Sequence, residues 1–236
     1  MRNSSSRRPG VATTLRAAAR LAWAAVTIVA IAATFAETAS RGPVNPFNFF
    51  GYFTIQSNSL LAATALIAGV AGLRRPGPQA GWVVVLRSLA TVCMVIVGLV
   101  YAVLLAPLGL EGGAPVPWAN WVMHVGGPVL AACDWAFARD REPLPWRAAL
   151  LQLIYPLVWT AVVLVRGATD GWVPYPFLSP EQGYGVVMAY AAVIALVFLA
   201  VSFGVVWWSR RFDGGARIAS PARTQSLGGR APHRST

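Results

Sequence analysis

Six apolar runs divide the chain, and each is close to the roughly 20 residues that an α-helix needs to cross a bilayer. Of the 236 residues, 56% are hydrophobic and only 11% are charged, whereas a soluble domain carries about 25% charged residues. There is too little polar material to cover a globular surface in water. The sequence therefore predicts an all-α polytopic membrane bundle of six transmembrane helices, at about residues 15–36, 54–73, 82–106, 118–138, 146–165 and 184–208.

The net charge of +11 arises from arginine, because the chain contains no lysine. If the N-terminus is cytoplasmic, every arginine except Arg41 and Arg166 falls on the inner side of the predicted membrane. Such an excess of basic residues is typical of cytoplasmic loops. We therefore expect a multi-pass protein of the cell membrane with both termini in the cytoplasm. A basic surface for nucleic acid would not alternate from loop to loop, so nucleic acid is not an expected partner.

The two ends of the chain differ in composition from the apolar runs. Residues 1–12 and 211–236 are rich in serine, arginine, glycine and proline and have little to bury, which predicts disordered basic cytoplasmic segments. Residues 13–210 are predicted to form the transmembrane domain. The first apolar run resembles a secretory signal but exceeds the usual apolar region of about 7–15 residues. We interpret it as an uncleaved first span.

His124 is the only histidine outside the C-terminal tail, and it lies within the fourth apolar run. Keeping an imidazole among lipid tails costs free energy, so an ionisable residue at such a position is by default a candidate for function. The second and fourth spans both enter from the outside. Thr54 then lies in the first turn of its span, and His124 lies about two turns below Trp118 at about 1.5 Å per residue. Both side chains are predicted to share the outer half of the membrane.

A hydroxyl beside an imidazole is the minimum for nucleophilic acyl chemistry, because the neutral ring accepts the hydroxyl proton while the oxygen attacks a carbonyl. Thr54 and His124 are the candidate catalytic pair. Other polar side chains on the same two spans are candidates for orienting the imidazole or for binding an oxyanion; they are Gln56, Ser57, Asn58 and Asn120.

Each of these residues also has a simpler structural interpretation. A threonine in a membrane helix commonly bonds to its own backbone, Ser57 and Asn58 suit hydrogen bonding between helices, and His124 can be a packing residue. Asp134, near the inner end of the fourth run, is expected to reach the interface or to pair with Arg139 or Arg141.

Pro128 and Pro156 lie inside apolar runs and are expected to kink their helices. A zinc site needs three or four ligands, and no such cluster lies at the depth of His124, so we expect neither a metal nor another cofactor.

Three stretches together resemble the androgen-induced protein family of six-span membrane threonine hydrolases and its bacterial relatives. They are residues 52–58 (YFTIQSN), 120–124 (NWVMH) and 171–178 (GWVPYPFL). The resemblance implies cleavage of fatty acid esters of hydroxy fatty acids, with Thr54 as the nucleophile and His124 as the base. The family motif carries a second histidine where this chain has Trp121, and Pro174 is an additional proline.

Two hypotheses of different classes follow. The first is an integral membrane hydrolase that takes a membrane lipid ester from the outer leaflet, with the segment 172–178 capping the cavity and with Trp172 and Tyr175 in its lining. The second is a non-enzymatic multi-pass protein, either a transporter or a lipid-binding scaffold, in which His124 is a packing or proton-linked group. Proton-coupled carriers usually contain relays of intramembrane charges, and the apolar runs contain few.

Overall fold

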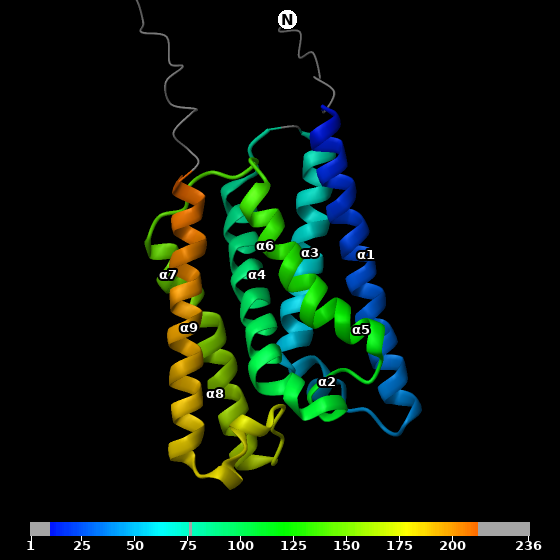
Figure 1. Ribbon diagram of the computed structural model, residues 1–236, viewed down its shortest axis with the longest axis vertical. Coiled ribbons are helices and arrows are strands. Elements are labelled where there is room, and N and C mark those ends of the chain that lie inside the picture. Colours follow the sequence, from blue (N-terminus) through cyan, green and yellow to red (C-terminus); the bar gives the residue numbers. More distant parts are fainter. Residues whose placement is uncertain (1–9, 76, 212–236) are drawn as a thin grey trace, which may run out of the picture.

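A computed structural model describes residues 10–75 and 77–211, which form a bundle of helices with no strand in these two ranges (Figure 1). The longest helices are α1 (Val11–Ser40), α3 (Phe53–Arg74), α4 (Gly81–Val100) and α9 (Tyr184–Arg211). The start of α1 and the end of α9 lie at the same end of the bundle, which we call the terminal end. The short α2 (Pro46–Gly51) lies at the opposite end, here the loop end.

Five helical stretches are long and apolar enough to cross a membrane: Val11–Ser40, Phe53–Arg74, Gly81–Gly109, Arg147–Thr169 and Tyr184–Arg211. They coincide with five of the six apolar runs in the sequence. Only 17% of the most apolar window of α9 is buried inside the protein. A helix that is apolar on all sides but covered on few is stable where lipid covers the rest, so these helices indicate a membrane protein.

The remaining apolar run forms consecutive helical pieces rather than one regular helix. These are α5 (Pro117–Trp121), a π-helical turn at Val122–Gly126, and α6 (Gly127–Phe137). The Gly127 amide donates to the Val122 carbonyl, five residues back. Pro128 explains the widening, because a proline ring clashes with the carbonyl four residues earlier, which here belongs to His124.

A second π-helical turn, Tyr101–Leu105, continues α4, and the Ala106 amide donates to the Tyr101 carbonyl. It is followed by Pro107 within a 3₁₀ segment, Ala106–Gly112. Single π turns in membrane and soluble helices are frequent at functional sites because they re-aim side chains. Tyr101 and His124 are thus both presented from widened turns.

Pro156 interrupts the fifth run in the same way. The run is divided at Leu153 into α7 (Arg147–Gln152) and α8 (Ile154–Thr169). The carbonyl four residues before Pro156 belongs to Gln152, the last residue of α7, which agrees with the predicted kink. Two short 3₁₀ turns, Pro176–Leu178 and Pro180–Gln182, then connect α8 to α9.

The helices pack in an order that brings distant parts of the sequence together. α1 packs along α3, α3 along α4, and α4 contacts both α6 and α9. The 117–137 segment crosses the bundle obliquely: α5 meets α1 near the loop end, and α6 lies beside α4 towards the terminal end (Figure 1). Gly127 permits the close crossing, because a Cβ there would lie 2.7 Å from the Met94 methyl group.

The predicted domain boundaries need one correction. α1 begins at Val11, so residues 11 and 12 are helical and do not belong to a disordered segment. α9 likewise includes Arg211. The predictions of disorder for residues 1–9 and 212–236 lie outside the described residues.

Candidate functional site

Thr54 and His124 meet inside the bundle near its loop end. Thr54 is the second residue of α3, and its Oγ1 lies 3.4 Å from Nε2 of His124 in the π turn. The two residues are only 8% and 6% exposed. The proximity expected from their depth is therefore present. The distance is at the long end for a hydrogen bond, as is common in catalytic sites without substrate.

The backbone around His124 determines which ring nitrogen carries the proton. Nδ1 lies 3.1 Å from the carbonyl oxygen of Asn120. A carbonyl only accepts hydrogen bonds, so this contact requires the proton on Nδ1. Nε2 of the neutral ring then directs its lone pair at the Thr54 hydroxyl. This tautomer is the one that a general base needs.

Tyr101 packs against the face of the His124 ring. Its ring stacks on His124 with centroids 4.3 Å apart and an interplanar angle of 26°. The Asn120 side chain donates to the Tyr101 hydroxyl at 2.8 Å and accepts from the Ala114 amide at 2.9 Å. Asn120 was predicted to orient the imidazole, and it contacts His124 through its carbonyl and Tyr101 through its side chain.

Tyr101 was missed in the sequence, although a signal was available. It is the only side chain with a hydroxyl between Thr91 and the end of its apolar run. A polar group at such a depth needs a hydrogen-bonding partner within the protein, and that requirement could have linked it to Asn120.

Tyr175, on the connection between α8 and α9, contacts Thr54 directly. Its hydroxyl oxygen accepts from the Thr54 amide at 3.2 Å and lies 3.3 Å from Thr54 Oγ1. The amides of the first helical turn lack partners within the helix, so this contact satisfies one of them. Burial raises the pKa of Tyr175 to about 12, which keeps the phenol neutral and able to donate.

These contacts form one continuous series of hydrogen bonds, from Tyr175 through Thr54 and His124 to Asn120. The Tyr175 hydroxyl proton is free to point at Thr54 Oγ1, because the phenol oxygen accepts from the Thr54 amide. The Thr54 proton then points at His124 Nε2, and the Nδ1 proton points at Asn120. Each hydroxyl donates once and accepts at least once, as the chemistry of these groups allows.

The other predicted site residues differ in their placement. Asn58 donates to the carbonyls of Thr54 at 2.9 Å and Met123 at 3.2 Å, and so joins α3 to the π turn directly beneath the pair. Gln56 instead donates to the Phe50 carbonyl and accepts from Tyr155. These contacts are with α2 and with α8, and not with His124.

Trp172, which was predicted to line the cavity, is not among the residues that line the two cavities beside Thr54. Its ring packs edge-on against Tyr52, with centroids 6.0 Å apart, and the Arg166 guanidinium lies 4.3 Å from its centroid. Tyr175 does line the cavities. Trp172 and Tyr175 are only three residues apart, and sequence spacing does not tell which one the loop turns inward.

Two cavities adjoin Thr54. One, of about 210 Å³, lies beside His124 and Met123 and is lined also by residues of α1 and α2. The other, of about 330 Å³, lies among α4, α8 and α9 and is almost entirely apolar. Thr54, Leu105 and Tyr175 line both. Thr54 therefore lies between two cavities, each of which has room for part of a ligand.

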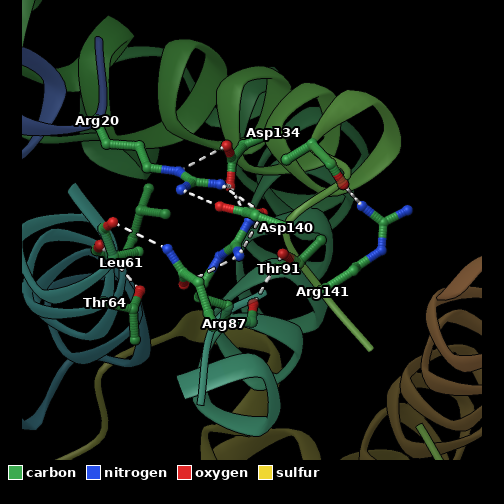
Figure 2. A network of polar contacts seen from close by, with 11 residues as sticks. Arg20, Leu61, Thr64, Arg87, Thr91, Asp134, Asp140 and Arg141 are labelled. Atoms are coloured by element: carbon green, nitrogen blue, oxygen red, sulfur yellow. Dashed lines mark hydrogen bonds and ion pairs between the residues drawn. The ribbon is translucent and has the colours of Figure 1, made fainter. Parts of the chain in front are cut away.

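A second polar cluster lies towards the terminal end of the bundle (Figure 2). Arg20 of α1 and Arg87 of α4 are both buried, and each binds Asp134 of α6 and Asp140 of the following loop. The nitrogen–oxygen distances of these ion pairs lie between 2.6 and 3.0 Å. We call these four residues the arginine–aspartate cluster.

The arginine–aspartate cluster corrects the pairing predicted for Asp134. Its partners are Arg20 and Arg87, not Arg139 or Arg141. The signal in the sequence was that Arg20 and Arg87 lie inside predicted spans, where a charge requires a partner. Burial raises the pKa of Asp140, but hydrogen bonds and charges from Arg20 and Arg87 outweigh it and lower the value to about 2.

Comparison of the chain with protein-family models, with curated proteins and with solved structures found no match. The functional interpretation rests on the geometry around Thr54 and on the three motifs quoted above.

Proposed function

We propose that the protein is an integral membrane hydrolase that cleaves a lipid ester with Thr54 as the nucleophile and His124 as the general base. The observation that carries the proposal is the 3.4 Å contact between the two side chains, together with the bond from His124 Nδ1 to Asn120. A threonine that served only to pack would commonly bond to the carbonyl four residues before it. Thr54 Oγ1 instead has the imidazole and Tyr175 as its partners.

The proposed reaction has two steps. Thr54 Oγ1 forms a bond to the ester carbonyl carbon while its proton moves to His124 Nε2; collapse of the tetrahedral intermediate breaks the bond to the alcohol oxygen, which takes that proton. A water molecule, deprotonated by the same nitrogen, then attacks the acyl-threonine and releases the fatty acid. The proton returns to Thr54.

Two features would stabilise the negative charge that develops during attack. The Tyr175 hydroxyl is a donor 3.3 Å from the attacking oxygen. Thr54 also lies in the first turn of α3, where the helix dipole favours negative charge. Preorganised donors of this kind commonly supply the largest part of the catalysis in acyl transfer.

We further propose that the chain crosses the cell membrane six times with both termini in the cytoplasm. The segment 117–137 supplies the additional span, because its consecutive pieces together reach about the length required. The terminal end, which carries most of the arginines, faces the cytoplasm, in accordance with the bias of basic residues in cytoplasmic loops. Thr54 and His124 then lie in the outer half of the bilayer.

The substrate class follows from the site and from the resemblance. A lipid ester is able to enter from the bilayer, and the cavity of about 330 Å³ beside Thr54 is apolar. The resemblance to the androgen-induced protein family points to fatty acid esters of hydroxy fatty acids. Such a molecule has two hydrocarbon arms, and Thr54 adjoins two cavities.

A fluorophosphonate probe tests the nucleophile in the purified full-length protein. We expect covalent labelling of Thr54, located by mass spectrometry, and its loss in Thr54→Val and His124→Gln. Thr27→Val is the matched control, since Thr27 is a fully buried threonine whose hydroxyl has no hydrogen-bond partner within residues 10–75 and 77–211; this variant should label as the unaltered protein does. Undiminished labelling in Thr54→Val would overturn the proposal.

One observation favours a second candidate, a non-enzymatic transporter. The arginine–aspartate cluster places buried charges among the apolar helices, and relays of such charges are common in carriers. Liposomes that contain the protein separate the two functions. Solute flux that survives Thr54→Val but is lost in Asp134→Asn would favour the transporter, particularly if no ester is hydrolysed.

A further inference from the structure

The cavity of about 330 Å³ connects the buried Thr54 with the lipid-facing side of the bundle. Its deep part is formed by side chains that are almost completely enclosed, among them Phe53, Ile96 and Phe198. Towards its mouth the lining includes exposed side chains of α8 and α9, Leu157 and Met188. The cavity therefore opens sideways, between the two helices that lie beside each other in Figure 1.

Small side chains keep this opening clear. Three alanines of α9, Ala191, Ala192 and Ala195, line the cavity, and Ala161 of α8 lies across from them. Pro156, which also lines it, marks the break between α7 and α8. Larger side chains at these positions would fill the space between α8 and α9, as the ridges of one helix fill the grooves of the next.

We infer that this cavity, which we call the α8–α9 channel, receives one hydrocarbon chain of a lipid directly from the bilayer and brings the group attached to that chain against Thr54. The inference rests on the proposed function only for the identity of the attached group, an ester carbonyl. Chain binding itself requires only the cavity, its opening and its apolar lining. The polar side-chain groups of that lining are the hydroxyls of Thr54, Thr160 and Tyr175 and the Trp159 indole N–H, which donates to the Gly51 carbonyl.

Such a channel selects among hydrocarbon chains by shape, and not through the removal of the chain from water. Lipid tails are as apolar as the lining, so a chain gains little from leaving one for the other. It gains from close contact along its length, and that contact ends where Phe53 and Phe198 close the cavity. When the ester lies against Thr54, the distance from there to the mouth sets how much of the chain makes such contact.

Ala195 is the residue we assign as a determinant of chain length. It lines the channel and is partly buried on α9. In Ala195→Phe the ring would occupy volume that the chain needs. Ala200, on the same helix, is exposed and is not part of the lining. Ala200→Phe is therefore the matched control, with the same change in size and helix propensity.

The experiment uses a hexadecanoate ester with a diazirine in its chain, incorporated with the full-length protein into phosphatidylcholine nanodiscs. After illumination, mass spectrometry maps the labelled residues. Any membrane probe labels side chains that face lipid, so the decisive positions are Phe198, Ile96 and Phe53, which lipid outside the protein does not reach. We expect labelling there, reduced at least about fivefold in Ala195→Phe and unchanged in Ala200→Phe.

The outcomes separate this inference from the proposed function. Labelling of the enclosed residues in Thr54→Val, without ester hydrolysis by that variant, supports both. Enclosed labelling in a protein that hydrolyses no ester supports the channel and overturns the hydrolase. Labelling confined to exposed side chains of the unaltered protein overturns the channel, whether or not the protein is a hydrolase, and this result does not depend on any variant folding.

A kinetic comparison provides a second measurement. Ala195→Phe should lower the rate on a hexadecanoate ester about tenfold more than it lowers the rate on an acetate ester. Equal losses on both esters would contradict the assignment of Ala195 as a determinant of chain length.

Discussion

The two polar clusters inside this bundle differ in charge: one is held by neutral hydrogen bonds and the other by ion pairs. Near the loop end, Thr54, His124 and Tyr175 are connected through neutral hydrogen bonds of 3.3–3.4 Å between side chains. Towards the terminal end, the arginine–aspartate cluster makes charged contacts as short as 2.6 Å. The first adjoins two cavities that Thr54 lines. In the second, each arginine already binds both aspartates, although a cavity of about 190 Å³ adjoins Arg20, Arg87 and Asp134.

This difference follows from the cost of burying charge. An unpaired ion in a medium of low dielectric constant is far less stable than an unpaired hydroxyl, so charged groups must bind one another completely to be tolerated. Neutral groups can remain partly satisfied and available to a ligand. We infer that the arginine–aspartate cluster stabilises one arrangement of α1, α4 and α6, whereas the neutral groups of the Thr54 site suit the reaction proposed above.

The largest effect is expected from breaking the arginine–aspartate cluster. In Arg87→Met two partly buried carboxylates share the one remaining arginine, and loss of one partner from a buried ion pair costs about 3–5 kcal/mol. We expect a fall of that size in the free energy of unfolding, measured by denaturant titration in detergent. Arg75→Met is the control, because Arg75 is exposed and makes no ion pair in the described part of the chain.

If Arg87→Met is as stable as Arg75→Met, the cluster is not a stabilising element and the contrast between the two regions fails. Thr54→Val, by comparison, should unfold close to the unaltered protein while it loses labelling by the fluorophosphonate. A large loss of stability in Thr54→Val would also contradict the contrast, because the Thr54 site would then be a stabilising element as well.

A smaller effect is expected when acid neutralises Asp140. The pKa of this carboxyl is about 2 in the folded protein and close to 4 in an unfolded chain. Because the folded pKa is depressed, the stabilisation is present in full above about pH 4 and is lost as the pH falls towards 2. The shift corresponds to about 2 kcal/mol.

Unfolding measured at pH 6, 4, 3 and 2 checks the expectation by comparing variants, since other carboxyl groups titrate as well. Asp140→Asn should be less stable at pH 6 and should lose less stability between pH 4 and 2. The exposed Asp170 supplies the control variant, Asp170→Asn, whose pH dependence should stay close to that of the unaltered protein. Parallel curves for Asp140→Asn and the unaltered protein would contradict the assignment.

The sequence was most informative where a property repeats along the chain. The apolar runs gave the positions of the helices, and the common depth of Thr54 and His124 indicated their meeting. It was least informative where one side chain chooses among distant partners. Asp134 lies near Arg139 and Arg141 in sequence but binds Arg20, 114 residues away, because the oblique crossing of α6 determines its neighbours.

The π turns explain a further part of what the sequence left open. A regular helix through residues 117–137 would place His124 and Asn120 in a different register, and the sequence did not tell which of Gln56, Ser57, Asn58 and Asn120 orients the imidazole. The widening before Pro128 and before Pro107 instead brings Tyr101 onto His124. A proline in the sequence predicts a kinked or widened helix. Which side chains come into contact there depends on the packing between helices.

The smallest expected effect concerns the hydroxyl of Tyr175. Tyr175→Phe keeps the ring that packs on Phe177 but removes the acceptor of the Thr54 amide and the donor beside Thr54 Oγ1. A neutral hydrogen bond contributes about 1 kcal/mol, so we expect the rate of fluorophosphonate labelling to fall about five- to tenfold. Tyr190→Phe is the control, since Tyr190 packs on the same Phe177 ring outside the site.

The pattern of rates distinguishes a positioning role from a role in stabilising developing charge. If Tyr175 only holds Thr54 in place, the loss should be similar for esters with good and poor leaving groups. If its hydroxyl also binds the oxyanion, the loss should be larger for poor leaving groups, whose transition states carry more negative charge on the carbonyl oxygen. An unchanged rate in Tyr175→Phe would exclude both roles and leave the Thr54–His124 pair to act without this donor.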